Sequence, residues 1–184
     1  MLSLRAQDPQ ILVSIVDDFL IYHNFDDNRI KQVRLSNGLI QADVPRGLEY
    51  DPNNCIFYCI TSVTNSPKLY SITKEGEVTF IARLSMSDGS NLYSCEGIAY
   101  DSSARKFYVS IRQVNIDNTT FNIAELNTSN AICTKVASLN TNGTKPDDAD
   151  FLEFYDDYLV LGDIYAPNTD SYVFLFDPDG IKSS

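Results

Sequence analysis

The sequence predicts an all-β protein, and two observations carry that prediction. Pro, Gly, Asn and Asp interrupt the chain roughly every eight to twelve residues, and no long apolar stripe of helical period survives between them. A strand–turn–strand pattern also recurs at a spacing of about 40 to 50 residues, which is typical of propeller blades. We therefore expect a small β-propeller of about four four-stranded antiparallel blades.

The repeated unit begins with a hairpin that is clearest in residues 46–62. There, the strand GLEY is followed by the turn DPNN and by the aromatic-rich strand CIFYCI. The same order of Gly, apolar residue, variable residue, Tyr and Asp returns at 96–110 in EGIAYDSSARKFYVS. Copies with a shorter turn are DFLEFYDDYLVLGD at 150–163 and ILVSIVDDFLIYHN at 11–24.

Further strand-like runs follow each hairpin and complete the units. They are residues 29–35 and 39–44, 68–73 and 78–84, 121–126 and 131–139, and finally 172–176 without a partner run. Residues 1–6, MLSLRA, have the composition of an outer strand but no unit of their own. We expect this N-terminal strand to pair with 172–176, which would close the last blade and remove exposed sheet edges.

The expected domain organisation is one β-propeller over residues 1–184, a length sufficient for a single core. Its approximate blades are 7–45, 46–94, 95–145, and 146–184 together with 1–6. A β-sandwich also contains many short strands, but it does not require in-register copies of a hairpin unit. The repeat therefore favours the propeller.

Charge and hydropathy restrict the partners and the compartment. The formal net charge of −11 and the pI near 4.3 disfavour binding to nucleic acid. Apolar runs fall far short of the roughly 20 residues that a membrane-spanning helix needs, and MLSLRAQDPQ lacks the features of a signal peptide. We expect either a cytoplasmic protein or a secreted one of which this chain is a mature piece.

The sequence contains four cysteines, Cys55, Cys59, Cys95 and Cys133. Cys55 and Cys59 would lie about 13 Å apart on one strand, beyond the reach of a disulfide. No C-x-x-C motif occurs and His23 is the only histidine, so a zinc site would lack its usual ligands. We expect buried free thiols, and the sequence leaves their redox state open.

Three N-glycosylation sequons begin at Asn118, Asn127 and Asn142. They are glycosylation sites only if the protein passes through a secretory compartment. With this many Asn, Ser and Thr residues, sequons also arise by chance, so they permit secretion without arguing for it.

The repeated segments GLEYDPNNCIFYCI…KLYSITKEGEVTFIARL and EGIAYDSSARKFYVS resemble blades of the NHL, regucalcin and gluconolactonase group of six-bladed propellers. In that group a G-[LI]-x-[YWV]-D strand precedes an aromatic-rich strand, and the resemblance covers nearly the whole chain. Six such blades need about 270 residues. The chain therefore forms a four-bladed ring like hemopexin domains, a part of a larger ring, or one ring together with a second chain. The absence of Trp disfavours WD repeats.

Alignment of the four copies predicts where a site would lie. Propeller sites occur at one end of the central channel, where the chain begins the innermost strand of each blade. The equivalent positions there are Arg46, Glu96 and Asp150, with the apolar Ile11 as the fourth. We expect Arg46 and Glu96 to pair at this channel mouth.

The resemblance also implies a metal site. In regucalcin-like hydrolases a Glu of an EGP motif and an Asp of a PDG motif help to hold a divalent metal. Glu96-Gly97 is similar to the first motif, and Pro146-Asp147-Asp148 resembles the second in part. The resemblance thus implies Ca²⁺ or Mg²⁺ bound by Glu96, Asp147 and Asp150, polarising an ester or lactone carbonyl and activating water.

Other catalytic arrangements find no support. A Ser-His-Asp triad would depend on His23, and neither a G-x-S-x-G motif nor a glycine-rich phosphate loop occurs. No catalytic residue is assigned. The leading hypothesis is a non-catalytic binding or scaffold propeller that contacts a protein partner or self-associates as a homo-oligomer. The alternative is a divalent-metal-dependent lactonase or esterase of the regucalcin–gluconolactonase type.

Overall fold

The structure is a computed structural model that describes residues 11–36, 44–61, 66–115, 118–138, 151–155, 157–163 and 172–176. Within these ranges the regular elements are all strands, and no helix that could cross a membrane is present there. The strands are β1 (Ile11–Val16), β2 (Phe19–Asn24), β3 (Arg29–Arg34), β4 (Pro45–Asp51), β5 (Ile56–Thr61), β6 (Lys68–Thr73), β7 (Val78–Arg83), β8 (Ser85–Met86), β9 (Ser94–Asp101), β10 (Lys106–Asn115), β11 (Asn118–Asn127), β12 (Ile132–Ser138), β13 (Phe151–Tyr155), β14 (Tyr158–Asp163) and β15 (Tyr172–Phe176).

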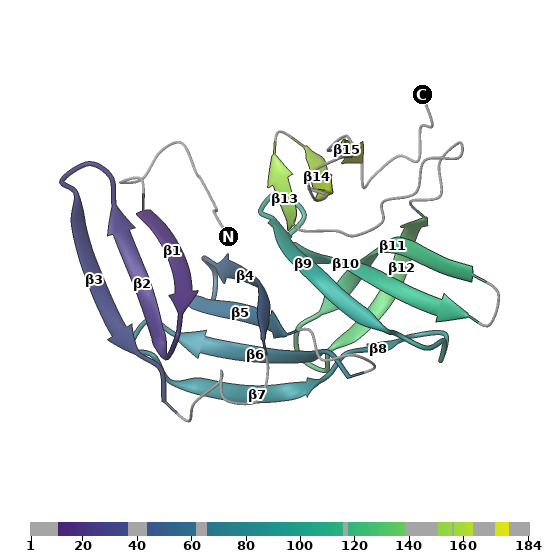
Figure 1. The fold of residues 1–184 in the computed structure, drawn as a ribbon, viewed down its shortest axis with the longest axis horizontal. Coiled ribbons are helices and arrows are strands. Elements are labelled where there is room, and N and C mark those ends of the chain that lie inside the picture. Colours follow the sequence, from purple (N-terminus) through teal and green to yellow (C-terminus); the bar gives the residue numbers. More distant parts are fainter. Residues whose placement is uncertain are drawn as a thin grey trace, which may run out of the picture.

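These strands form four sheets that follow one another in chain order. The first sheet is β1-β2-β3, the second β4-β5-β6-β7, the third β8-β12-β11-β10-β9 and the fourth β13-β14-β15. Neighbouring sheets contact each other through β1, β4, β9 and β13, so the sheets succeed one another around an arc (Figure 1). The all-β class predicted from the sequence is confirmed. The second sheet is a four-stranded antiparallel blade, the third has four antiparallel strands and the added β8, and the first and fourth each have three strands within the described residues.

One detail of the strand assignment differs from the prediction, and two predicted strands are not tested. β8 was not expected; it pairs in parallel with β12 at Ile132 and Cys133, so the chain leaving the second sheet adds a short edge strand to the third. The expected strand at 39–44 lies, apart from Val44, outside the described residues. The closing strand at 1–6 lies outside them as well.

The hairpin turns explain why Asp recurs at the end of the innermost strands. The Asp51 carboxylate accepts hydrogen bonds from the backbone N–H groups of Asn53 (2.9 Å) and Asn54 (3.3 Å). Asp101 accepts equivalent bonds from Ser103 (2.7 Å) and Ala104 (3.0 Å). Both carboxylates are buried, and such bonds offset the cost of burying the charge. Asp at this position therefore fixes the turn between the two innermost strands.

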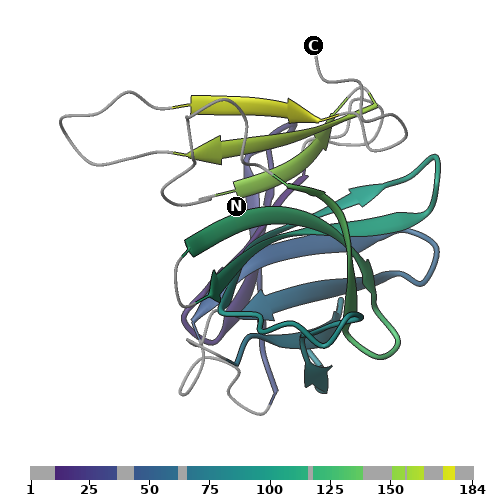
Figure 2. The same cartoon turned by 90° about the vertical axis from the view of Figure 1, so that its right-hand side faces the viewer.

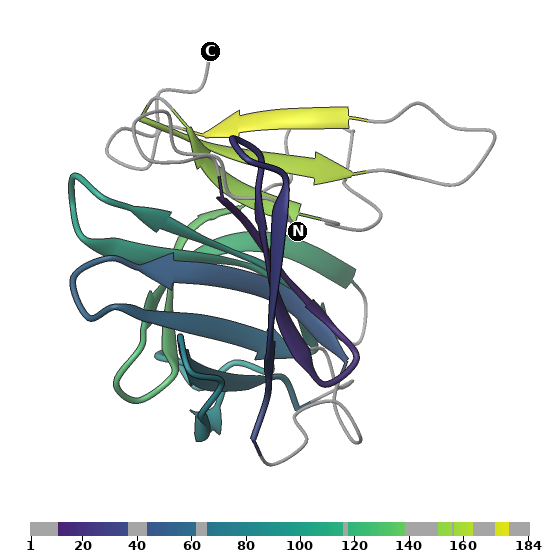
Figure 3. The same ribbon diagram turned by 90° about the vertical axis from the view of Figure 1, so that its left-hand side faces the viewer.

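The hydrophobic core lies between the sheets. One cluster, which includes Leu20, Phe57 and Ile72, joins the first and second sheets. A second cluster, around Ile60 and Val109, joins the second and third sheets. A third cluster joins the third and fourth sheets through Ala99, Tyr108, Phe121, Ile123, Leu152, Leu159 and Leu161. Figures 2 and 3 show the fourth sheet as a layer over its neighbours, and the first sheet crossing the second steeply.

Glycines on the innermost strands allow the sheets to approach closely. A Cβ atom added to Gly47 would lie 2.8 Å from Cγ2 of Ile98 on the next sheet, and one added to Gly97 would lie 2.6 Å from the backbone nitrogen of Leu152. The two contacts are equivalent in the repeat, because Ile98 and Leu152 each follow the glycine position of their own strand. Any larger residue would push the inner strands apart.

We predict that Gly97→Ala destabilises the protein by about 1–3 kcal/mol, because the new methyl group meets backbone that cannot yield. Chemical denaturation measures the change in the free energy of unfolding. Gly89→Ala is the matched control: a Cβ there meets nothing within 4 Å, and only the positive φ of 74° opposes it, at a cost of about 1 kcal/mol. Wild-type stability of Gly97→Ala would contradict the close approach of β9 and β13.

Candidate functional site

The starts of β4 and β9 bring together two residues of the predicted channel mouth. The Arg46 Nε atom lies 3.6 Å from Oε2 of Glu96, whose side chain is only 12% exposed, whereas that of Arg46 is 50% exposed. Glu96 occupies a β-bulge, since Ser110 pairs with Gly97 and Ile111 pairs with Cys95. The bulge turns the Glu96 carboxylate toward the neighbouring sheet, where Arg46 meets it.

Of the other residues of the predicted site, only Ile11 belongs to the described part of the chain. Asp147 and Asp150 lie outside the described residues, and Ile11 is an exposed residue at the start of β1. Among the described residues, no group of three or more His, Cys, Asp or Glu side chains is placed to hold a metal ion. Glu96 is the only predicted metal ligand among the described residues, and its carboxylate contacts the Arg46 guanidinium.

A second polar group lies on the third sheet and was not identified from the sequence. The Arg112 guanidinium lies over the rings of Tyr93 and Phe121, with its central carbon 5.3 Å and 5.6 Å from the two ring centroids. The signal for it was the sequence VSIRQVN, in which Ser110 and Arg112 occupy one face of the strand and Val109 and Ile111 the other. Alternation along one strand gives no partner for these two residues, so it does not identify a site.

Hydrogen bonds on the opposite face of β10 fix the segment that carries Tyr93. The side chain of Gln113 donates to Oγ of Ser90 (2.6 Å), that of Asn122 donates to Oε1 of Gln113 (2.8 Å), and that of Ser138 donates to Oδ1 of Asn122 (2.9 Å). The backbone N–H of Tyr93 donates to the Arg112 carbonyl (2.8 Å). The segment that carries Tyr93 is therefore held by side chains and backbone of three strands, β10, β11 and β12.

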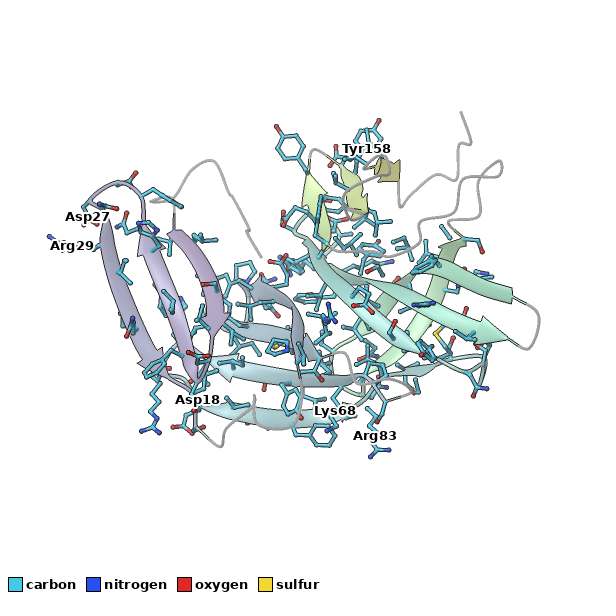
Figure 4. The ribbon with its side chains drawn as sticks, viewed as in Figure 1. Asp18, Asp27, Arg29, Lys68, Arg83 and Tyr158 are labelled. Carbon is cyan, nitrogen blue, oxygen red and sulfur yellow. The ribbon has the colours of Figure 1, made fainter. Side chains whose placement is uncertain are left out.

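One face of the fourth sheet exposes large apolar side chains. Tyr155 is 71% exposed, Tyr158 46%, Val173 66% and Leu175 65%. Tyr155 pairs with Tyr158, Leu175 with Val160, and Val173 with Gly162, so all of them lie on the same face. Figure 4 shows Tyr158 at the outer side of this sheet, away from the core. We call this surface the free face of the fourth sheet.

The cysteines correct one prediction. Within the described residues all four thiols are free, but Cys55 is exposed, whereas the other three are buried as expected. Cys55 has a φ of 58° and closes the β4–β5 turn, so it does not belong to the strand on which the sequence placed it. Burial raises the pKa of Cys59 and of Cys133 to about 12. It also raises the pKa of Cys95 far above its usual value, with smaller contributions from Cys133 and Glu96.

The sequons lie in different surroundings. Asn127 is exposed at the end of β11, where its side-chain oxygen accepts hydrogen bonds from the backbone N–H (3.0 Å) and hydroxyl (2.7 Å) of Ser129. Asn118 begins β11, and Asn142 lies outside the described residues. Glycosylation of these residues stays a prediction.

Solved structures with the same fold are β-propellers. A protein assigned as a gluconolactonase has a TM-score of 0.55 and 13% identity over 96% of this chain. A GH43 glycoside hydrolase with endo-xylanase and exo-arabinofuranosidase activity matches with a TM-score of 0.52 and 16% identity over 90% of this chain. The Malassezia sympodialis allergen Mala s 1 matches with a TM-score of 0.50 and 10% identity over 94% of this chain. This similarity confirms the propeller fold and the resemblance to gluconolactonase-type blades.

The chain spans 59%, 36% and 58% of these three proteins, respectively. No protein-family model and no curated sequence matches it. At identities this low the comparisons establish the fold and leave the activity to be argued from the residues.

We predict that a single thiol per folded chain reacts with Ellman's reagent, because the thiolate is the nucleophile and the buried thiols stay protonated between about pH 7 and 9. Cys55→Ser should abolish this reaction, and Cys59→Ala should leave it unchanged. Unfolding in denaturant should release four thiols. Rapid reaction of more than one thiol in the folded protein would contradict the burial of Cys59, Cys95 and Cys133.

Proposed function

We propose that the protein is a non-catalytic binding propeller whose fourth sheet docks against another β-sheet, and that its partner is a second copy of this chain. The observation that carries the proposal is the free face of the fourth sheet, with Tyr155, Tyr158, Val173 and Leu175 between 46% and 71% exposed. Fully burying one such side chain contributes about 1.5–3 kcal/mol. Large exposed apolar side chains gathered on one sheet face, here beside Glu153, mark an interaction surface.

The repeat indicates what kind of structure covers the face. On the second sheet the same face, at Gly47, packs against Ile98 of the third. On the third sheet it packs, at Gly97, against Leu152 of the fourth. The free face is therefore the surface that a following blade would cover, and its natural ligand is the apolar face of another antiparallel sheet.

The first sheet supplies a complementary surface in the same chain. Its outward face exposes Val16 (49%), Phe19 (36%) and Ile30 (62%). Arg34 lies on this outward face because it pairs with Phe19, whereas Arg29 and Lys31 pair with Asn24 and Tyr22 on the opposite face. The strands of the first sheet contain no Asp or Glu, and those of the fourth sheet contain no Lys or Arg. Opposite charge favours contact between the first sheet of one copy and the fourth sheet of another, despite the net charge of −11.

We predict a dimer in solution, of twice the chain mass of 20.6 kDa, in light scattering coupled to size exclusion. Leu175→Glu should convert it to the monomer, because a charge enters the apolar contact. Thr79→Glu adds the same charge at an exposed position of β7 and should leave the dimer intact. Ile30→Lys should weaken it as well, and the double variant with Leu175→Glu should recover part of the association.

A folded monomer of the wild type at all concentrations would rule out the second copy as the partner. A dimer unaffected by both Leu175→Glu and Ile30→Lys would place the interface elsewhere. Failure of the double variant to recover association would contradict the pairing of the fourth sheet with the first.

The metal-dependent lactonase or esterase is the alternative, with Ca²⁺ or Mg²⁺ held by Glu96, Asp147 and Asp150. We predict that millimolar calcium leaves the melting temperature unchanged in the wild type and in Glu96→Ala, because Arg46 already occupies the vicinity of the carboxylate. Asp27→Ala is the matched control, since it removes a carboxylate 3.2 Å from Arg29 elsewhere. A calcium-dependent rise in melting temperature that Glu96→Ala abolishes would favour the hydrolase.

A further inference from the structure

The Arg112 guanidinium contacts aromatic rings, but one of its hydrogen-bond donors has no acceptor. The rings of Tyr93 and Phe121 lie near the guanidinium, which gains cation–π attraction from both. Its Nε atom is buried without a hydrogen-bond partner. Among the described residues, no carboxylate forms an ion pair with Arg112. The guanidinium therefore keeps a buried Nε–H donor for which the described side chains supply no acceptor.

Two serine hydroxyls on the same face of the third sheet share this property. Ser94 pairs with Arg112 across β9 and β10, and Ser110 lies two residues before Arg112 on β10. The Oγ atoms of Ser94 and Ser110 are both buried and have no hydrogen-bond partner. Buried polar atoms are nearly always paired, so unpaired ones side by side indicate a missing water, ion or ligand.

We propose that Arg112, Ser94 and Ser110 form a binding site for a small carboxylate, at the start of β9 on the side that faces the fourth sheet. A carboxylate is planar and accepts two parallel hydrogen bonds from a guanidinium, which matches the edge that Tyr93 and Phe121 leave free. The serine hydroxyls would donate to its remaining lone pairs. A phosphate carries more charge than one arginine neutralises, so the single cation favours the carboxylate.

The site is independent of the proposed dimer. It lies on the face of the third sheet that carries Phe121 and Ile123, inside the interface with the fourth sheet. The proposed docking surface is the opposite face of the fourth sheet. A ligand at Arg112 would therefore bind equally to the monomer and the dimer.

Acetate is the probe for this site, and the Arg112 Nε–H resonance in protein labelled with ¹⁵N-arginine is the readout. Acetate titrated at constant ionic strength should shift this resonance saturably, with affinity in the millimolar range. Arg112→Lys keeps the positive charge but removes the guanidinium group. The resonance that disappears in this variant is therefore that of Arg112. Binding to that variant, followed through the amide resonances of the third sheet, should weaken at least tenfold. Ser94→Ala and Ser110→Ala should each weaken it about 3- to 10-fold, as expected for one hydrogen bond.

Arg83→Lys is the matched control, because Arg83 is an exposed arginine on β7 of the second sheet; acetate binding should not change. A linear, unsaturable shift, or equal affinity in Arg112→Lys, would overturn the proposal. A shift that appears only after Asp147, Asp148 and Asp150 are replaced by Asn would also overturn the proposal. It would mean that a carboxylate of the protein itself binds Arg112 in the wild type. Thermal unfolding of each variant confirms that it is folded.

Discussion

The arrangement of the sheets depends on the close approach of their innermost strands at Gly47 and Gly97. The space that a side chain would need at Gly47 is occupied by Ile98 of the next sheet, and at Gly97 by the backbone of Leu152. This approach brings the aromatic second strands into contact, as for Tyr58 and Phe107, whose ring centroids are 5.0 Å apart in an edge-on arrangement. The inter-sheet clusters then form on both sides of the third sheet. The contact between β1 and β4 is slight, and Leu12, the equivalent position of the first sheet, lies on the outward face with His23 and Ile30.

Within the described residues, the first and fourth sheets differ from the middle of the arc because each has only one neighbouring sheet. Inner sheets bury both faces, whereas the first and fourth sheets each bury one and expose the other. The exposed residues at the ends are the same types that fill the inter-sheet core elsewhere. A surface built from core residues favours association, and this is the physical basis for assigning the protein a binding role.

Polar groups gather where the chain begins the innermost strands. Glu96 leaves the strand at a bulge and contacts Arg46, across the boundary between the second and third sheets. Arg112 lies on the other side of the third sheet, between two aromatic rings. The first cation has a protein carboxylate within reach and the second has none among the described residues. This difference in partners separates a structural ion pair from a candidate ligand site.

The sequence by itself determined the strands, the turns and the repeat, because these depend on local chemistry: period-two alternation, and a carboxylate such as Asp51 or Asp101 that binds the next turn amides. It also placed Arg46 and Glu96 at equivalent repeat positions, which the tertiary structure brings within 3.6 Å. Only the tertiary structure decided that Cys55 is exposed, that β8 joins the third sheet, that Arg112 lies between Tyr93 and Phe121, and which sheet faces stay uncovered. Those features depend on which residues of one sheet meet those of the next, and alternation along a single strand does not encode that pairing.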